Sequence, residues 1–340
     1  MSRTGGLLLV LDGNSLVHRA YHASDGSPEP APALRGLVGY LARAAAQLRP
    51  DAVLVGFDCP HDSARRTDHP DYKAHRPAKP AELTRQLQIA PDLLRAAGVG
   101  TVVPPAYEAD DVLASSAALA RSLGWQSVLM TSDRDAFALI DDTTSVLRIR
   151  NGGFDRSVLV DAASLAAAYG VHPWQYTDFA ALRGDPSDNL PGVRRFGART
   201  AARLLTAFGS VDAAWQADVA ALREAVGELA ATALLEPAAR EAVDRNRRLM
   251  RMRHDLPVPS LETARLPLDY LVIRRALREH GINLGPSLWA LVGGDAPAPS
   301  LLEQEPPEPP PAWAATLKPR VLHGSMSGRR DPIPGQTALF

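Results

Sequence analysis

Short apolar runs alternate with segments of helical spacing in the first half of the chain, and this alternation limits the possible folds more than any other feature. The apolar runs cover residues 7–12, 52–58, 99–103 and 127–131, and the helical segments between them cover residues 34–48, 84–97 and 110–123. Alternation of this kind is typical of a parallel sheet with helices on both faces. The sequence therefore predicts an α/β fold with a mostly parallel central sheet.

Acidic side chains are concentrated where these runs end. Asp12 and Asp58 each end an apolar run, and Asp133 follows the run at 127–131. Because functional sites of such sheets lie at the carboxyl ends of the strands, we expect these three carboxylates to share one site. Three acidic clusters of the chain contain Glu108, Asp110, Asp111, Asp133, Asp135, Asp185 and Asp188.

Carboxylates gathered this densely repel one another unless cations lie between them. Hard oxygen ligands suit Mg²⁺ or Mn²⁺, and a pair of such ions is the usual means of in-line attack on a phosphodiester. A single aspartate at a strand end is more often a helix N-cap, so each acid taken alone has a simpler explanation. The set as a whole predicts metal-dependent phosphodiester hydrolysis.

The composition of the chain is compatible with this chemistry. A net charge of −1 is unfavourable for a nucleic-acid-binding protein, but nine of the 38 acidic residues would face cations if the metal sites exist. The 340 residues are enough for about two domains, and the single cysteine, Cys59, excludes an internal disulfide. The N-terminal apolar run is too short for a signal peptide or a membrane span, so we expect a cytoplasmic, nucleoid-associated protein without membrane contact.

The acidic residues belong to short motifs whose order is specific. The motifs lie at residues 12–14 (Asp-Gly-Asn), 57–58 (Phe-Asp), 72–76 (Tyr-Lys-Ala-His-Arg), 107–112 (Tyr-Glu-Ala-Asp-Asp-Val), 131–135 (Thr-Ser-Asp-Arg-Asp) and 184–193 (Gly-Asp-Pro-Ser-Asp-Asn-Leu-Pro-Gly-Val). In this order they resemble the bacterial 5′-nuclease family, which includes the N-terminal 5′→3′ exonuclease domain of DNA polymerase I and the flap endonucleases. The resemblance covers residues 5–290.

The resemblance implies two divalent metal ions, Mg²⁺ or Mn²⁺, at neighbouring positions. One ion would be surrounded by Asp12, Asp58, Glu108, Asp110 and Asp111, and the other by Asp133, Asp135, Asp185 and Asp188. One metal would help to generate the attacking hydroxide, and both would stabilise the charge of the transition state.

The resemblance also implies a helical arch over the metals, formed by residues 61–90. Lys73 and Arg76 match its basic pair and would contact the scissile phosphate as catalytic residues. Tyr72 would stack on a base, and Arg65 matches a DNA-binding position of the arch. A solvated helix face is the alternative for these basic residues.

Two helical stretches joined by a glycine-containing turn follow the last acidic cluster and resemble the helix–hairpin–helix variant of the family. Backbone N–H groups of such a turn bind a DNA phosphate, and a K⁺ ion would bridge the turn to the duplex. Arg195 stands where relatives usually have glycine, and a plain helical turn is the alternative interpretation. The expected DNA-binding residues are Gly192, Val193, Arg195, Gly197, Arg199 and Thr200.

These observations divide the chain into three parts. We expect an α/β core with the arch at residues 1–180, a helical DNA-binding region at 181–292, and a proline-rich disordered tail at 293–340, because ten of the 29 prolines lie beyond residue 294. A basic run at residues 245–253 is as compatible with a solvated helix face as with a DNA contact. The last residues resemble a peptide that docks on the bacterial sliding clamp, with Gln336, Leu339 and Phe340 as its anchors.

The resemblance implies a standalone 5′→3′ exonuclease and flap endonuclease that acts in DNA replication and repair. It would be a monomer that cleaves DNA and RNA primers on duplexes with a 5′ flap, a nick or a 5′ end. One alternative is a catalytically silent paralogue that binds branched DNA. Another is a ribonuclease of the PIN type, although such chains are shorter and lack the arch and the hairpin turn.

Overall fold

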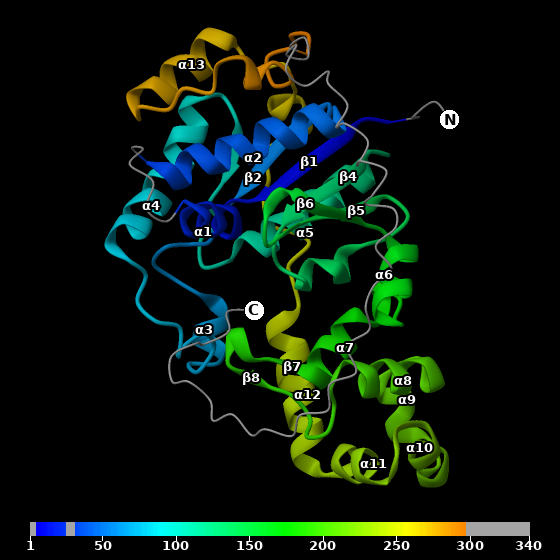
Figure 1. Cartoon of the computed structure of the whole chain (residues 1–340). Helices are drawn as coiled ribbons and strands as arrows, with labels where there is room; N and C mark the ends of the chain where they lie inside the picture. Colours follow the sequence, from blue (N-terminus) through cyan, green and yellow to red (C-terminus); the bar gives the residue numbers. More distant parts are fainter. Residues whose placement is uncertain (1–4, 25–30, 297–340) are drawn as a thin grey trace, which may run out of the picture. The chain divides into compact units, whose positions relative to one another are not determined.

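A six-stranded sheet forms the centre of the computed structural model, which describes residues 5–24 and 31–296 (Figure 1). The strand order is β3-β2-β1-β4-β5-β6, and every neighbouring pair is parallel except β5 and β6. The predicted mostly parallel α/β sheet is confirmed. The strands are β1 (Leu7–Asp12), β2 (Ala52–Gly56), β3 (Gly100–Val102), β4 (Gln126–Thr131), β5 (Thr144–Arg150) and β6 (Gly153–Val160).

Helices cover both faces of this sheet because successive strand residues point to opposite faces. In β1, Leu8 and Val10 belong to the core cluster that contains α5, whereas Leu7, Leu9 and Leu11 belong to the cluster that contains α1, α2 and α4. All six residues of β1 are buried, as expected for a central strand of a parallel sheet. The helices are α1 (Gly13–Ala23), α2 (Pro32–Leu48), α4 (Ala81–Ala96) and α5 (Ala109–Ser122).

The hairpin of β5 and β6 extends the sheet beyond the four strands that the sequence predicts. β5 pairs in parallel with β4, and β6 returns antiparallel at the edge. The alternation of apolar and polar residues in β5 is interrupted where Val146 and Leu147 follow each other, which weakens the strand signal. The structure therefore adds two strands to the prediction without changing the fold class.

The expected arch is only partly helical. It consists of the short helix α3 (Ala64–Asp68), a stretch of turns over residues 69–76 and an extended segment that leads into α4. α4 begins three residues before the helix that the sequence predicts. A turn-rich segment can follow the surface of the metal centre more closely than a continuous helix can.

The second half of the described chain is mostly helical, as predicted. α12 packs along α7, and α8 packs on α7 and α10 (Figure 1). All described residues belong to one compact unit, and the division at residues 180 and 292 stays a prediction. The helices are α6 (Ala162–Tyr169), α7 (Tyr176–Arg183), α8 (Ala198–Phe208), α9 (Val211–Gln216), α10 (Val219–Val226), α11 (Glu228–Leu235), α12 (Pro237–Met250) and α13 (Tyr270–Glu279).

In the part of the chain that the structure describes, no helix has the length and apolar character needed to cross a bilayer.

Candidate metal centre

The carboxyl ends of β1 and β2 hold two of the predicted metal ligands in fixed orientations. Asp12 caps α1 by accepting a hydrogen bond from the Ser15 N–H at 2.9 Å, and its other oxygen accepts from the Thr131 hydroxyl at 2.7 Å. Asp58 accepts from the Asn14 amide at 2.7 Å and from the Ala109 N–H at 2.9 Å. Burial, followed by the charge of Asp58, raises the pKa of Asp12 to about 7.

The first turn of α5 adds Glu108 and Asp110 to this site. A Glu108 oxygen accepts from the Tyr72 hydroxyl at 3.2 Å and from the Lys73 ammonium at 3.0 Å. Asp110 has a buried Oδ1 atom without a hydrogen-bond partner. Desolvation, followed by the charges of Asp12 and Asp133, raises the pKa of Asp110 well above its usual range. Such an oxygen is costly to bury unless a cation binds it.

A second group of acids lies beside the first. The Asp135 N–H donates to Asp133 at 3.1 Å, and Asp185 caps a short turn by accepting from the Ser187 N–H at 2.8 Å. Desolvation and the charges of Asp133, Asp185 and Asp188 raise the pKa of Asp135. Residues of both groups line the same small pocket, namely Glu108, Asp110, Asp135 and Asp188.

These donors fit hard divalent cations. Within residues 5–24 and 31–296, no three acidic, histidine or cysteine side chains converge closely enough to hold one ion together. The charge of the carboxylates is instead partly balanced by Lys73 and Arg76. The chemistry of the donor set, all carboxylate oxygen, and the unpartnered oxygen of Asp110 are what Mg²⁺ or Mn²⁺ would require.

The assignment of Asp111 as a metal ligand is wrong. Its carboxylate is fully buried and forms a bidentate pair with Arg65, at 2.6 and 2.8 Å. The same two oxygens also accept from the N–H groups of Glu108 and Arg253. With these four hydrogen bonds the lone pairs of Asp111 are occupied, so it stabilises the start of α5 instead of binding metal.

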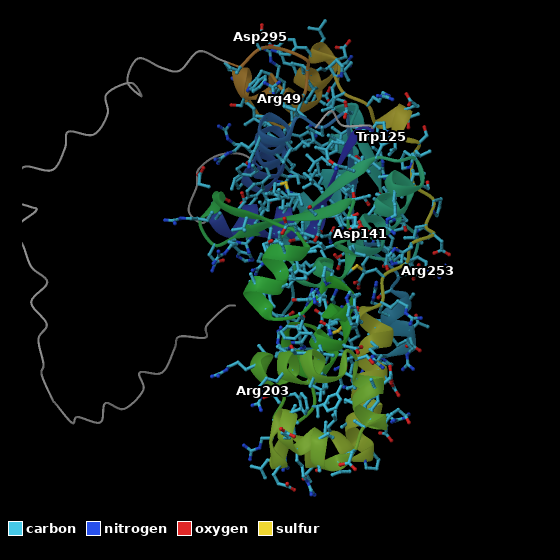
Figure 2. The ribbon with its side chains drawn as sticks, turned by 90° about the vertical axis from the view of Figure 1, so that its right-hand side faces the viewer. Arg49, Trp125, Asp141, Arg203, Arg253 and Asp295 are labelled. Carbon is cyan, nitrogen blue, oxygen red and sulfur yellow. The ribbon has the colours of Figure 1, made fainter. Side chains whose placement is uncertain are left out.

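The assignment of Arg65 as a DNA-binding residue is wrong for the same reason. Its guanidinium is largely buried and also donates to the carbonyls of Leu249, at 2.8 Å, and Arg251, at 3.2 Å. Arg65 therefore joins α3 to α5 and to the segment that follows α12. Arg253 lies on that segment (Figure 2).

Tyr72 does not offer its ring to a base, which corrects a further prediction. The ring is buried in a small apolar cluster with Leu190 and Leu249, and its hydroxyl donates to Glu108. Tyr72 therefore orients a predicted metal ligand. An aromatic residue beside two basic ones has the same sequence pattern in either role, so the sequence could not distinguish stacking from packing.

Lys73 and Arg76 lie beside two of the predicted metal ligands, Glu108 and Asp188. The Lys73 ammonium is 3.0 Å from Glu108 and 3.8 Å from Asp188, and the Arg76 guanidinium is 2.5 Å from Asp188. Lys73 has a φ of 56°, and its backbone N–H donates to the Asp188 carbonyl at 3.0 Å. The arch and the last acidic cluster are thus connected through backbone and side-chain contacts.

A cavity of about 830 Å³ opens between the metal centre and α4. Its wall contains Asp58 and Glu108 on the metal side, and Phe57, Leu87 and Val103 supply an apolar floor. The cations around it are Arg66, Lys73, Arg76, Lys79 and Arg95. A cavity of this size, with one apolar wall and several cations, has room for more than one nucleotide.

The turn between α7 and α8 has the expected form, but its residues differ in what they expose. Val193 is buried and its N–H donates to the Leu182 carbonyl, so this residue holds the turn in place and offers no free donor. Gly192 packs against the backbone of Arg183, where a Cβ would collide. The exposed residues are Arg195, Gly197 and Arg199, and Thr200 is half-buried.

Arg195 has a φ of 71°, a conformation that favours glycine. The positive φ gives a physical reason for the glycine that the family resemblance leads us to expect at this position. Gly197 precedes α8 without a side-chain cap, which leaves the first N–H groups of α8 for a ligand. Arg203 projects from the outer surface of α8 (Figure 2).

The basic run at residues 245–253 is largely occupied by internal contacts. Arg247 pairs with Asp178 and Asp212, Arg248 pairs with Asp68, and Arg253 pairs with Asp255. These contacts support a structural role for most of the run. Gln336, Leu339 and Phe340 lie outside the described residues.

Some residues of the site escape the sequence prediction. Thr131 orients Asp12, and Asn14 orients Asp58 through both its amide nitrogen and its carbonyl oxygen. Asn14 is the third residue of the motif at 12–14, and Thr131 begins the motif at 131–135. Their membership of these motifs could have identified them as residues of the site. Polar residues of this kind fix the orientation of the ligands that they contact.

Two family models match the chain. The first is the 5′-3′ exonuclease, N-terminal resolvase-like domain, over residues 7–170, and the second is the 5′-3′ exonuclease, C-terminal SAM fold, over residues 171–269. The boundary between them lies between α6 and α7.

Curated relatives include DNA polymerases. The thermostable DNA polymerase I of Thermus thermophilus is 32% identical over 350 residues, which cover 97% of this chain and 40% of the polymerase. The DNA polymerase I of Mycobacterium tuberculosis (strain ATCC 25618 / H37Rv) is 35% identical over 257 residues, which cover 74% of this chain and 28% of the polymerase. The chain thus spans less than half the length of these relatives.

Solved structures with the same fold include two of the bacteriophage T5 D15 protein. One is co-crystallised with metal ions, with a TM-score of 0.60 and 22% identity over 72% of this chain and 89% of that protein. The other is the T5 D15 flap endonuclease in a pseudo-enzyme–product complex with DNA and metal ions. It has a TM-score of 0.58 and 22% identity over 72% of this chain and 88% of that protein.

Proposed function

This chain belongs to the 5′-3′ exonuclease family of metal-dependent 5′-nucleases, and we propose that it cleaves phosphodiesters of DNA and of RNA primers near 5′ ends, nicks and 5′ flaps in replication and repair. The observation that carries the proposal is the convergence of both acidic groups on one pocket, where Asp110 keeps an unpartnered oxygen. Helix capping alone does not require so many carboxylates to lie buried side by side.

Two ions, Mg²⁺ or Mn²⁺, would supply the attacking hydroxide and stabilise the charge that develops on the phosphate. Thr131 and Asn14 fix the orientation of Asp12 and Asp58 before any ion binds. The groups that would hold the ions are Asp12, Asp58, Glu108 and Asp110 at one position and Asp133, Asp135, Asp185 and Asp188 at the other.

Lys73 and Arg76 would bind the scissile phosphate from the arch side. Both cations already lie among the carboxylates, so a phosphate that enters the centre comes within their reach. They offset the negative charge that grows on the phosphate during in-line attack. The 5′ single strand would then occupy the adjoining cavity, whose rim carries Arg66, Lys79 and Arg95.

The turn that precedes α8 would bind the duplex through its backbone. The N–H groups at the start of α8 and the exposed Arg195 and Arg199 suit a phosphate without reading base sequence. A K⁺ ion held at this turn would add positive charge that attracts the DNA backbone. We infer that the protein acts as a monomer in the cytoplasm, at the nucleoid.

Digestion of a 5′-labelled double-flap duplex tests the proposal. We expect cleavage at the base of the flap with Mg²⁺ or Mn²⁺ and none with EDTA, while the metal-free protein still binds the duplex. Binding without any metal-dependent cleavage would instead identify a silent binder of branched DNA. Preferential cleavage of single-stranded RNA would favour a PIN-type ribonuclease.

Replacement of Lys73 by alanine tests the role of the arch. We expect the single-turnover rate to fall by about 10²–10³, because the charge on the scissile phosphate loses one preorganised cation. The dissociation constant for the flap duplex should change little. Arg85→Ala serves as the control, since Arg85 lies on α4 and pairs only with Glu82 among the described residues. A rate within threefold of the wild type would exclude Lys73 from the reaction.

The C-terminal residues Gln336, Leu339 and Phe340 would dock on the sliding clamp. Gln336 can hydrogen-bond a polar notch, and the two apolar side chains can fill a pocket beside it. Deletion of residues 336–340 should abolish retention on immobilised clamp and leave cleavage of linear flaps unchanged. Equal retention of the full-length and shortened proteins would contradict this assignment.

A further inference from the structure

Three arginines cluster at the carboxyl end of β4 and β5, beside the metal centre. Arg148 and Arg150 are two residues apart at the end of β5, and the pairing of β5 with β6 is irregular between them. Arg148 pairs in register with Thr131 at the end of β4, and Arg134 follows that strand between Asp133 and Asp135. The proposed cleavage reaction involves none of these three arginines.

No ion pair within residues 5–24 and 31–296 neutralises the cluster. Among the described residues, Arg134, Arg148 and Arg150 form no ion pair, and Arg148 makes only a long hydrogen bond of 3.5 Å to the Ser132 carbonyl. Burial, followed by the charge of Arg134, lowers the pKa of Arg148. A half-buried guanidinium beside like charges is unfavourable unless an anion from outside compensates it.

The position of the cluster fits a nucleic-acid backbone that passes the metal centre. Adjacent strands are about 4.8 Å apart, and β4 separates β5 from β1, so the end of β5 lies on the order of 10 Å from Asp12. A phosphate held here would therefore lie within a few nucleotides of the scissile phosphate.

The cluster also lies on a definite side of β1. In the sheet, β4 and β5 are on one side of β1, and β2 and β3 are on the other. α7, which leads into the turn at residues 192–197, packs against the segment after β4, where Phe137 and Tyr176 are 5.4 Å apart. The arginines thus lie on the side of the centre toward the proposed duplex-binding turn.

We propose that Arg134, Arg148 and Arg150 form a phosphate-binding site for the duplex part of the cleaved strand, within a few nucleotides of the scissile bond. The proposal rests on the proposed function and adds a binding site between the metal centre and the turn at residues 192–197. Contacts to phosphate position the strand without reading its sequence.

Fluorescence anisotropy of a flap duplex in EDTA over a salt series tests the proposal. The variants are Arg134→Gln and Arg150→Gln, with Arg150→Lys to restore the charge. We expect the slope of log K against log salt to fall by about one per glutamine substitution, with severalfold weaker binding, and Arg150→Lys to recover most of both. Thermal melting of each variant shows that it is folded.

Arg121→Gln is the matched control. It removes one charge from the end of α5, where Arg121 pairs with Asp141 near the amino end of β4, at the opposite edge of the sheet. Its salt slope should equal that of the wild type. Equal slopes for Arg134→Gln, Arg150→Gln and Arg121→Gln would overturn the proposal.

Neutral methylphosphonates placed one at a time over the first five duplex positions locate the contact. Substitution at the position whose phosphate Arg150 contacts should weaken binding to the wild type and have no further effect on Arg150→Gln, because the two changes remove one interaction. Additive losses at all five positions would overturn the assignment.

Cleavage with Mg²⁺ is measured separately and decides the proposed function. If the glutamine substitutions lower the salt slope in EDTA but the wild type does not cleave with Mg²⁺, the nuclease assignment is contradicted and the phosphate site is supported. If the wild type cleaves normally but the glutamine substitutions leave the slope unchanged, the nuclease assignment is supported and the phosphate site is contradicted.

Discussion

At the scale of single residues, Asp110 is the acid that distinguishes a metal site from a set of helix caps. Every other acid of the first group accepts a hydrogen bond from the chain, and such contacts alone could explain its presence. Asp110 has a buried oxygen that nothing in the described chain satisfies, beside the charges of Asp12 and Asp133. A carboxylate in that position is unfavourable for folding and is explained by a cation.

Replacement of Asp110 by asparagine should therefore stabilise the metal-free protein and remove its response to metal. The neutral amide relieves repulsion from Asp12 and Asp133, so the melting temperature in EDTA should rise. The further rise that Mg²⁺ gives the wild type by mass action should shrink. Differential scanning fluorimetry measures both effects, and a variant with a lower melting temperature in EDTA and an unchanged Mg²⁺ response would contradict this assignment.

His18 gives a pH dependence that can be measured without metal. Burial, followed by the charges of Lys79, His22 and Arg76, lowers its pKa from 6.5 to about 4. Between these values the unfolded chain binds a proton that folded His18 does not, so the free energy of unfolding contributed by His18 rises with pH from 4 to 6.5. The partly exposed position reduces this contribution to ~1–2 kcal/mol.

Urea unfolding in EDTA at pH 4.5 and 7.5 checks this expectation. Carboxylates also titrate in this range, so the result is the difference between the wild type and His18→Gln. The variant should lose less stability than the wild type on acidification, whereas His75→Gln, an exposed histidine of the arch, should behave as the wild type. Parallel curves for His18→Gln and the wild type would rule out the role of His18.

At the scale of elements, the turn between α7 and α8 combines tight packing with exposed cations. Val193 and Phe196 are buried and anchor the turn, while Arg195 accepts a left-handed conformation to keep its side chain in solvent. A positive φ at a residue other than glycine costs backbone strain.

Arg195→Gly should raise the free energy of unfolding and weaken duplex binding. Removal of the side chain at a φ of 71° should gain ~0.5–1 kcal/mol, and loss of the cation should reduce the salt slope by about one. Arg194→Gly is the control, because Arg194 does not have a positive φ and glycine there should cost stability. Urea unfolding and anisotropy measure the two effects, and a destabilised Arg195→Gly protein would contradict the strain argument.

At the scale of the whole described unit, one buried ion pair connects segments that are far apart in the sequence. Arg65 on α3 pairs with Asp111 on α5, and both also bond to the segment after α12 through Leu249, Arg251 and Arg253. The base of the arch, α5 and the helical region are thereby held together.

Arg65→Met should destabilise the protein by ~3–5 kcal/mol, because Asp111 would remain buried without its counterion. Arg65→Met combined with Asp111→Asn should lose less than the sum of the two single changes. Urea unfolding of the single and double variants measures this coupling. The salt slope of DNA binding should stay unchanged in any folded Arg65 variant, and a lower slope would restore Arg65 as a DNA contact.

Much of the site follows from local sequence, but its division of roles does not. Asp12 and Asp58 end buried strands, and parallel strands place such residues at one edge, so their proximity was predictable. Asp110 and Asp111 are neighbours on α5, and successive helix residues point about 100° apart. One therefore faces the metal centre and the other faces Arg65, and no local pattern indicates which. The roles of Arg65 and Tyr72 depended on the same packing.

The sequence by itself determined the sheet, its acidic carboxyl edge and the family of the chain, because strand periodicity, strand ends and ordered motifs are local properties. Only the tertiary structure decided that Asp111 and Arg65 neutralise each other, that Tyr72 packs inside, and that Arg134, Arg148 and Arg150 gather beside the metal centre. These outcomes depend on which side chains meet across segments distant in sequence, since burial and charge compensation arise only when those segments pack.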